Sequence, residues 1–96
     1  MDQAWFYILA SQRNGTLYCG STNELARRIW EHKTDVFSGF TSRYGVKTLV
    51  YYEGFNLLME ARAREYAVKR WRRTWKLQLI EAMNPEWIEL YYDLNR

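Results

Sequence analysis

Five polar side chains occur where a chain built only for packing would use apolar residues. Tyr7 and Tyr18 lie in two segments with the composition of β-strands. Arg28 and His32 follow in a segment with helical spacing, and Glu65 lies much later on an otherwise apolar helical face. A buried charge without a partner is costly. These residues are therefore candidates for one reactive site.

The types of these side chains suit the hydrolysis of a phosphate ester. A guanidinium such as that of Arg28 stabilises charge that develops on a phosphoryl group. A single carboxylate, here Glu65, suits one loosely held Mg²⁺ that keeps most of its water ligands. A tyrosine hydroxyl can accept or relay a proton if a nearby cation lowers its pKa from about 10. The chain has no glycine-rich phosphate loop, Cys/His zinc spacing or Ser/His/Asp set.

A predicted β-hairpin positions the two tyrosines. Residues 5–10 are rich in β-formers, and Asn14-Gly15 is typical of a two-residue type I′ turn. A turn centred on this pair places Ser11 opposite Tyr18. Because side chains alternate along a strand, Tyr7 and Tyr18 are expected on the same face, at a distance that the pattern does not fix.

A helix is expected directly after the hairpin. Ser21 and Glu24 have the spacing of a capping box, which predicts a helix from about Thr22 to Lys33. At helical spacing, Leu25, Ile29 and His32 lie on one face of this helix, and Arg28 falls on the same face. The arginine is therefore expected on the face that packs against the hairpin.

The next segments are predicted as a long loop over residues 34–46 and a strand over residues 47–53. Loops of this length often contact ligands. The loop contains Phe40, Arg43 and Tyr44, which could stack on or clamp a nucleic acid. The alternative is that the aromatic rings fold back onto the core, and we favour this alternative.

The second half of the chain has mainly helical patterns. Asn56 can cap a helix whose stripe contains Leu58, Ala61, Glu65 and Val68. Helical spacing continues through Trp71, Trp75 and Leu79, with a break near Arg73-Thr74. We interpret the two tryptophans as core anchors rather than base-stacking platforms. Asn84-Pro85 predicts the start of a last helix.

Size and composition favour one folded domain over residues 1–96, with 48% hydrophobic and 18% aromatic residues. The longest apolar run, residues 4–10, is far shorter than the ~20 residues of a membrane span, and no leader precedes it. Cys19 is the only cysteine, which excludes an internal disulfide and fits a reducing compartment. We expect an intracellular, cytoplasmic protein without a membrane partner.

The positive charges are concentrated in one segment. Half of the 14 basic residues lie between Arg62 and Lys76, where Glu65 is the only acid. Contacts from about four of them to phosphates would give a log–log salt slope of about 3 to 4. The alternative is a solvated helix face. The candidates for nucleic-acid contacts are Lys33, Arg43, Lys69, Arg72, Arg73 and Lys76.

Several fragments in order resemble the GIY-YIG nuclease domain, and more closely its small stand-alone members. The first are Trp5-Phe6-Tyr7-Ile8, Tyr18-Cys19-Gly20, Leu25, Arg28 and His32. The later ones are Gly39-Phe40-Thr41, Tyr44-Gly45-Val46, Leu49-Val50-Tyr51, Trp75-Lys76 and Asn84-Pro85-Glu86-Trp87. Trp5-Phe6 replaces the Gly-Ile of the first motif and Cys19 the Ile of the second, which removes no reactive group.

The resemblance implies an α+β fold, with a three-stranded antiparallel sheet flanked by helices. It also implies cleavage of phosphodiester bonds with Mg²⁺ or Mn²⁺. By position, Tyr7 and Tyr18 match the motif tyrosines, Arg28 the catalytic arginine and Glu65 the metal-binding glutamate. His32 matches a histidine that would orient water or phosphate. Asn84 could match a late asparagine of the family, although its capping pattern also explains it.

We therefore expect a metal-dependent endonuclease, acting on DNA rather than RNA and on structured or branched substrates in repair or recombination. Specificity would come from the basic segment, from self-association or from a partner protein. One alternative is a non-catalytic nucleic-acid-binding module of the same fold. Another is a protein–protein adaptor that uses exposed aromatic residues.

Overall fold

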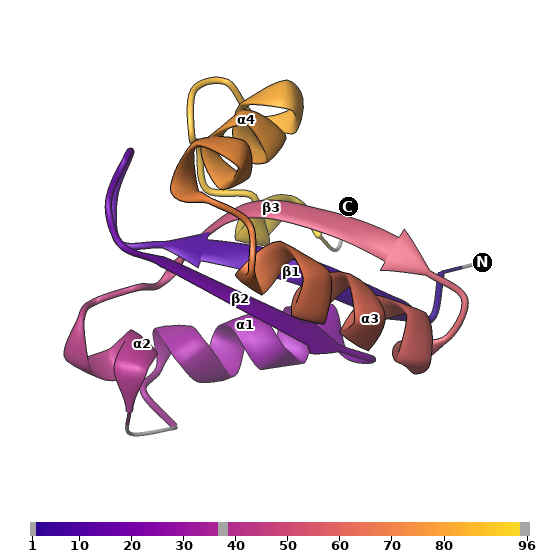
Figure 1. Ribbon diagram of the computed structural model, residues 1–96. Helices are drawn as coiled ribbons and strands as arrows, with labels where there is room; N and C mark the ends of the chain where they lie inside the picture. Colours follow the sequence, from indigo (N-terminus) through magenta and orange to yellow (C-terminus); the bar gives the residue numbers. More distant parts are fainter. Residues whose placement is uncertain (1, 37–38, 95–96) are drawn as a thin grey trace.

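The computed structural model describes residues 2–36 and 39–94 of the chain. In chain order the elements are β1 (Ala4–Ala10), β2 (Leu17–Thr22), α1 (Leu25–Lys33), α2 (Phe40–Arg43), β3 (Thr48–Phe55), α3 (Leu58–Lys69), α4 (Arg73–Met83) and a 3-10 turn η1 (Tyr91–Asp93). Figure 1 shows the sheet and the helices around it. The α+β class and the three-stranded antiparallel sheet are confirmed. No helix within the described residues has the length and apolar character of a membrane span.

The sheet has the order β2-β1-β3, so β1 is the central strand. Every residue of β1 except Trp5 is buried, as expected for a continuous apolar strand that is covered on both faces. One face packs against α3 and α4, through residues that include Phe6, Ile8, Val68 and Ile80. The other face packs against α1, through residues that include Tyr7, Leu9, Leu25 and Ile29. Side chains from β1 therefore reach both layers.

The hairpin register differs from the predicted one by two residues. Tyr18 pairs with Leu9 instead of Ser11. The reason is a wider loop, in which the Gly15 N–H donates to the Gln12 carbonyl at 2.9 Å and the Ser11 hydroxyl accepts from the Thr16 N–H at 2.9 Å. Because the shift is even, the tyrosines keep their shared face and move closer together.

The predicted start of the first helix is wrong. Strand β2 continues to Thr22, and α1 begins only at Leu25. The Ser21 side chain does not cap the helix, because its hydroxyl donates to Glu65 of α3. A tertiary partner therefore replaces the local capping box.

Three further boundaries differ from the prediction. The loop of residues 34–46 contains the one-turn helix α2. The N-cap of α3 is Leu57 rather than Asn56, and the Leu57 N–H donates to the Glu60 carboxylate at 3.1 Å. The break between α3 and α4 lies at residues 70–72, earlier than Arg73-Thr74.

No helix starts at Asn84-Pro85. Asn84 is the C-cap of α4, and its buried side chain makes three hydrogen bonds to the backbone. The amide nitrogen donates to the carbonyls of Val50 at 3.1 Å and Ile88 at 2.9 Å, while Oδ1 accepts from the Ile88 N–H at 3.1 Å. The segment after α4 turns back toward β3 instead, with Trp87 at a φ of 55°. Asn84 thus fastens the C-terminal segment to the sheet.

We expect Asn84→Ala to destabilise the fold by about 2 to 3 kcal/mol, because it leaves buried backbone groups without partners. Urea unfolding followed by circular dichroism measures this, with the exposed Asn23→Ala as the control. A stable Asn84→Ala protein that has lost only its activity would contradict the structural role.

Candidate active site

An open cleft of about 530 Å³ is lined by residues of the edge strand β2 and of the helices α1 and α3. Figure 1 shows how these three elements are arranged around the sheet. We call this cleft the tyrosine cleft. Its lining residues are Tyr7, Tyr18, Gly20, Ser21, Arg28, Arg62, Glu65, Tyr66 and Lys69. Four of the five predicted site residues therefore meet at one place, and His32 does not line the cleft.

The two tyrosines differ in exposure. Their ring centroids are 6.4 Å apart, but Tyr7 is 1% exposed whereas Tyr18 is only partly buried. Gly20 pairs with Tyr7 across the hairpin, and a Cβ there would lie 2.4 Å from the Tyr7 hydroxyl oxygen. The glycine therefore makes room for this hydroxyl. Burial raises the pKa of Tyr7. The neighbouring Tyr18 raises the pKa of Tyr7 further, while Arg28 opposes the shift, so Tyr7 keeps its proton at neutral pH.

His32 lies behind Tyr7 rather than in the cleft. It is 6% exposed, and its Nε2 is 3.0 Å from the Tyr7 hydroxyl. Its Nδ1 is 3.0 Å from the hydroxyl of Thr41, a buried residue of α2 that we did not predict. Burial and the charge of Arg28 lower the pKa of His32, with Glu31 opposing, so the imidazole is neutral at pH 7. These contacts connect His32 to Tyr7 on one side and to Thr41 on the other.

Arg28 presents a partly desolvated guanidinium to the cleft. Its side chain is 41% exposed, compared with 68% for the neighbouring Arg27. The Arg28 Nε lies 3.3 Å from a carboxylate oxygen of Glu31, a residue one turn along α1. Although it is paired with Glu31, Arg28 still lines the cleft. Such a group can bind a phosphate oxygen in a bidentate manner.

Glu65 enters the cleft from α3, on the opposite side from α1. One carboxylate oxygen accepts the Ser21 hydroxyl at 2.5 Å, and the other lies 2.5 Å from the Lys69 ammonium. Sequence reasoning missed Ser21 as a site residue, because its spacing to Glu24 matched a helix cap. The signal for it was a hydroxyl residue directly after Gly20 of the second motif.

The donor set fits one weakly held divalent ion. Within residues 2–36 and 39–94, no three His, Cys, Asp or Glu side chains are close enough to form a metal cluster. Among the residues that line the cleft, Glu65 alone offers carboxylate oxygens, and one of these oxygens is now paired with the Lys69 ammonium. This arrangement suits Mg²⁺ or Mn²⁺ that keeps most of its waters.

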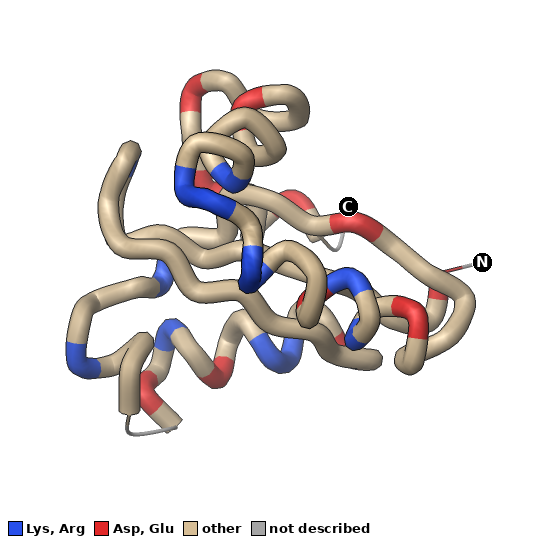
Figure 2. The backbone as a smooth tube through the Cα atoms, in the orientation of Figure 1, with Lys and Arg blue, Asp and Glu red and all other residues tan. Residues whose placement is uncertain are grey.

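The predicted phosphate contacts fall into two groups. Figure 2 shows Lys and Arg gathered where α3 ends and α4 begins. Lys69 lines the cleft, and Arg72 is exposed with its guanidinium 4.8 Å from the centre of the Trp75 ring. Arg73 donates to the carbonyls of the hairpin loop, and the Lys76 ammonium lies 3.3 Å from the Lys69 carbonyl. These four residues are close to one another along the α3–α4 junction.

Lys33 and Arg43 are elsewhere. The Lys33 ammonium donates to the Lys47 carbonyl at 2.7 Å and pairs with Glu89, beside the rings of η1. Lys33 therefore fastens the C-terminal segment and leaves the set of candidate phosphate contacts. Arg43 is exposed on α2, with its guanidinium 5.6 Å from the centre of the Tyr44 ring.

Several aromatic residues do not fold into the core as expected. Phe40 is 47% exposed and stacks on Tyr18, with ring centroids 6.3 Å apart and planes at 30°. Tyr44 is half-exposed beside it. Trp71 packs partly against the core, but Trp75 is 46% exposed and is not a core anchor. The aromatic faces near the cleft and at the α3–α4 junction are therefore open to ligands.

Comparisons with known proteins agree with this geometry. The family model described as the GIY-YIG catalytic domain matches residues 3–78. UPF0213 protein CPE1444 of Clostridium perfringens is 40% identical over 78 residues, which cover 81% of this chain and 83% of that protein. UPF0213 protein DP2720 of Desulfotalea psychrophila is 36% identical over 90 residues, which cover 93% and 82% of the two chains.

A solved structure shows a similar fold. It is the solution NMR structure of the UPF0213 protein BH0048 from Bacillus halodurans, with a TM-score of 0.55 and 31% sequence identity. The similarity covers 88% of each chain. The match of the family model includes both tyrosines, the arginine and the glutamate of the cleft. The chain therefore belongs to the GIY-YIG family of catalytic domains, among its small UPF0213 members.

Proposed function

We propose that this protein is a divalent-metal-dependent endonuclease that hydrolyses phosphodiester bonds in DNA, with structured or branched DNA as its substrate. One observation supports this most. Arg28 and Glu65, which come from the helices α1 and α3, line the same cleft as Tyr7 and Tyr18. A partly buried charged side chain on an apolar helix face does not improve packing. In a cleft, however, such side chains can contribute to binding a phosphate group.

Each residue of the tyrosine cleft has a separate role in the proposed hydrolysis. Arg28 binds the phosphate and stabilises the charge that builds up on its oxygens. Tyr18 passes its own hydroxyl proton to solvent and then takes the proton of the attacking water, because Tyr18 is the more exposed tyrosine and the Tyr7 hydroxyl is buried against His32. Tyr7 keeps its proton and positions Arg28, which is hydrogen-bonded to it. Glu65 would hold Mg²⁺ or Mn²⁺, which supplies Lewis-acid stabilisation of the leaving oxygen when bound.

A non-catalytic nucleic-acid-binding module is the second candidate, and one contact favours it. The Lys69 ammonium occupies the side of Glu65 that a metal ion would use. If Lys69 does not move away, the cleft binds phosphate through Lys69, Arg62 and Arg28 without hydrolysis. In either case the basic residues at the α3–α4 junction supply DNA affinity, and self-association or a partner protein adds specificity.

We expect Arg28→Ala and Glu65→Ala each to lower cleavage at least about 100-fold, because each removes stabilisation of the transition state. The assay uses labelled flap, splayed, single-stranded and duplex DNA with Mg²⁺ or Mn²⁺, and EDTA should stop it. Arg27→Ala is the matched control and should cleave normally, since the Arg27 side chain is 68% exposed and does not line the cleft.

Equal products from the wild type and both variants would identify a contaminating nuclease and overturn the proposal. Tight DNA binding by the wild type without any cleavage would favour the non-catalytic module.

We also expect Tyr18→Phe to lower kcat at least about 100-fold while DNA affinity changes little, because only the proton acceptor is lost. Single-turnover cleavage and a binding titration in EDTA separate the two effects. Cleavage by Tyr18→Phe at the wild-type rate, with loss in Tyr7→Phe, would assign proton transfer to Tyr7 instead.

A further inference from the structure

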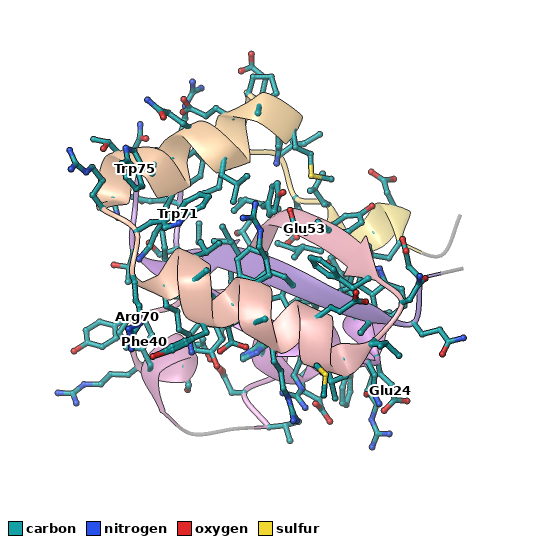
Figure 3. The ribbon with its side chains drawn as sticks, turned by 45° about the vertical axis from the view of Figure 1, so that its right-hand side comes forward. Glu24, Phe40, Glu53, Arg70, Trp71 and Trp75 are labelled. Atoms are coloured by element: carbon teal, nitrogen blue, oxygen red, sulfur yellow. The ribbon has the colours of Figure 1, made fainter. Side chains whose placement is uncertain are left out.

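An exposed aromatic surface lies outside the cleft, at the junction of α3 and α4. Trp71 and Trp75 pack edge to face with ring centroids 6.0 Å apart (Figure 3). With Gln78 and Leu79 they line an open hollow of about 380 Å³ whose wall is mainly apolar. We call these four residues the junction surface. A large aromatic side chain that stays half-exposed beside such a hollow is typical of a binding site.

Guanidinium groups lie over the aromatic rings along this surface. Arg64 is 5.1 Å from the centre of the Trp71 ring, and Arg72 is 4.8 Å from that of Trp75. Alternating cations and ring faces match a nucleic-acid strand, which alternates phosphates and bases. An apolar segment of a partner protein would instead desolvate the Arg72 guanidinium without supplying an anion, whereas a strand phosphate can pair with it. Arg64 already has an anionic partner in Glu53.

Residues 69 and 70 lie between the tyrosine cleft and the junction surface along the chain. Arg70 lies 3.9 Å from the centre of the Tyr66 ring, and Tyr66 lines the cleft. Lys69 also lines the cleft and directly precedes Arg70. A strand whose phosphate lies at Arg28 can therefore continue over basic residues to the tryptophans.

We propose that the junction surface stacks the bases of an unpaired nucleic-acid strand whose neighbouring phosphodiester enters the cleft. The inference rests on the proposed function and specifies its substrate, namely DNA with a single-stranded part. Bases inside a duplex are already stacked on each other and cannot lie on Trp75, so duplex DNA gains little from this surface.

The test measures the affinity of a fluorescent oligo-dT strand of about 12 nucleotides and of a duplex of equal length, in EDTA so that nothing is cleaved. We expect Trp75→Leu to weaken binding of the single strand about tenfold and to leave duplex binding unchanged. Trp75→Phe should keep most of the affinity. Trp30→Leu is the matched control, because Trp30 is 50% exposed on α1 and lies outside both surfaces.

Normal strand binding by Trp75→Leu, or an equal loss for strand and duplex, would overturn this inference and leave the cleavage assay untouched. Loss of strand binding in Trp75→Leu without cleavage by the wild type would overturn the proposed nuclease activity alone.

A separate observation concerns the hydrogen bonds behind the cleft. The buried Tyr7 hydroxyl must donate its proton, and Arg28 can only donate in return. The acceptor within reach is Nε2 of His32. A neutral imidazole that accepts at Nε2 carries its proton on Nδ1, and Nδ1 lies 3.0 Å from the Thr41 hydroxyl.

The geometry points to Thr41 as a positioning residue that selects the Nδ1–H tautomer of His32 and so orients Tyr7. The hydrogen bonds then run from His32 Nδ1–H to Thr41 and from Tyr7 to His32 Nε2, and Arg28 donates to Tyr7. Thr41 of the short helix α2 thereby helps to orient Arg28 of α1, through the buried side chains of His32 and Tyr7. This inference does not depend on the junction surface.

The chain has one histidine, so its ring nitrogens give a single set of NMR signals. We expect long-range ¹H–¹⁵N spectra to show a protonated Nδ1 in the wild type and in Thr41→Ser. Thr41→Val keeps the shape but removes the acceptor, so its spectrum should shift toward the Nε2–H tautomer or toward a mixture. Its kcat should fall about tenfold, with rescue in Thr41→Ser.

A wild-type spectrum with the proton on Nε2, or an identical spectrum for Thr41→Val, would overturn the role of Thr41. These spectra are recorded without substrate, so the result stands whether or not the protein cleaves DNA.

Discussion

The hydrogen bond between Ser21 and Glu65 is the contact on which the site depends. It joins the edge strand β2 to α3, two elements separated by more than one third of the chain. Apolar packing places α3 on the sheet, and this contact then orients the Glu65 carboxylate toward the strand that also carries Tyr18. The tyrosine cleft is therefore a product of sheet-to-helix packing, and the hairpin forms only one of its walls.

Regular patterns allowed much of the fold to be predicted. The stripe of Leu25, Ile29 and His32 is buried as expected, because helical spacing alone fixes which residues share a face. The shared face of Tyr7 and Tyr18 was also correct despite the wrong turn, since an even shift in register preserves the alternation of side chains. Glu65 was found because a charge on an apolar stripe conflicts with simple packing.

The errors have one physical cause, which is that distant partners outcompeted local ones. Ser21 has the spacing of a helix cap but bonds to α3 instead. Asn84 has the pattern of an N-cap, yet its amide satisfies backbone groups of β3 and of the returning segment. Thr41 could not be singled out, because its importance depends on how α2 packs against His32. Such contacts are visible only once the chain is folded.

The pairing of Lys69 with Glu65 has a consequence for the protein without metal. Glu65 already has a counter-ion from its own helix, so the folded chain does not need a divalent ion to neutralise this partly buried carboxylate. A divalent ion at Glu65 would have to displace the Lys69 ammonium from the carboxylate oxygen that it now contacts.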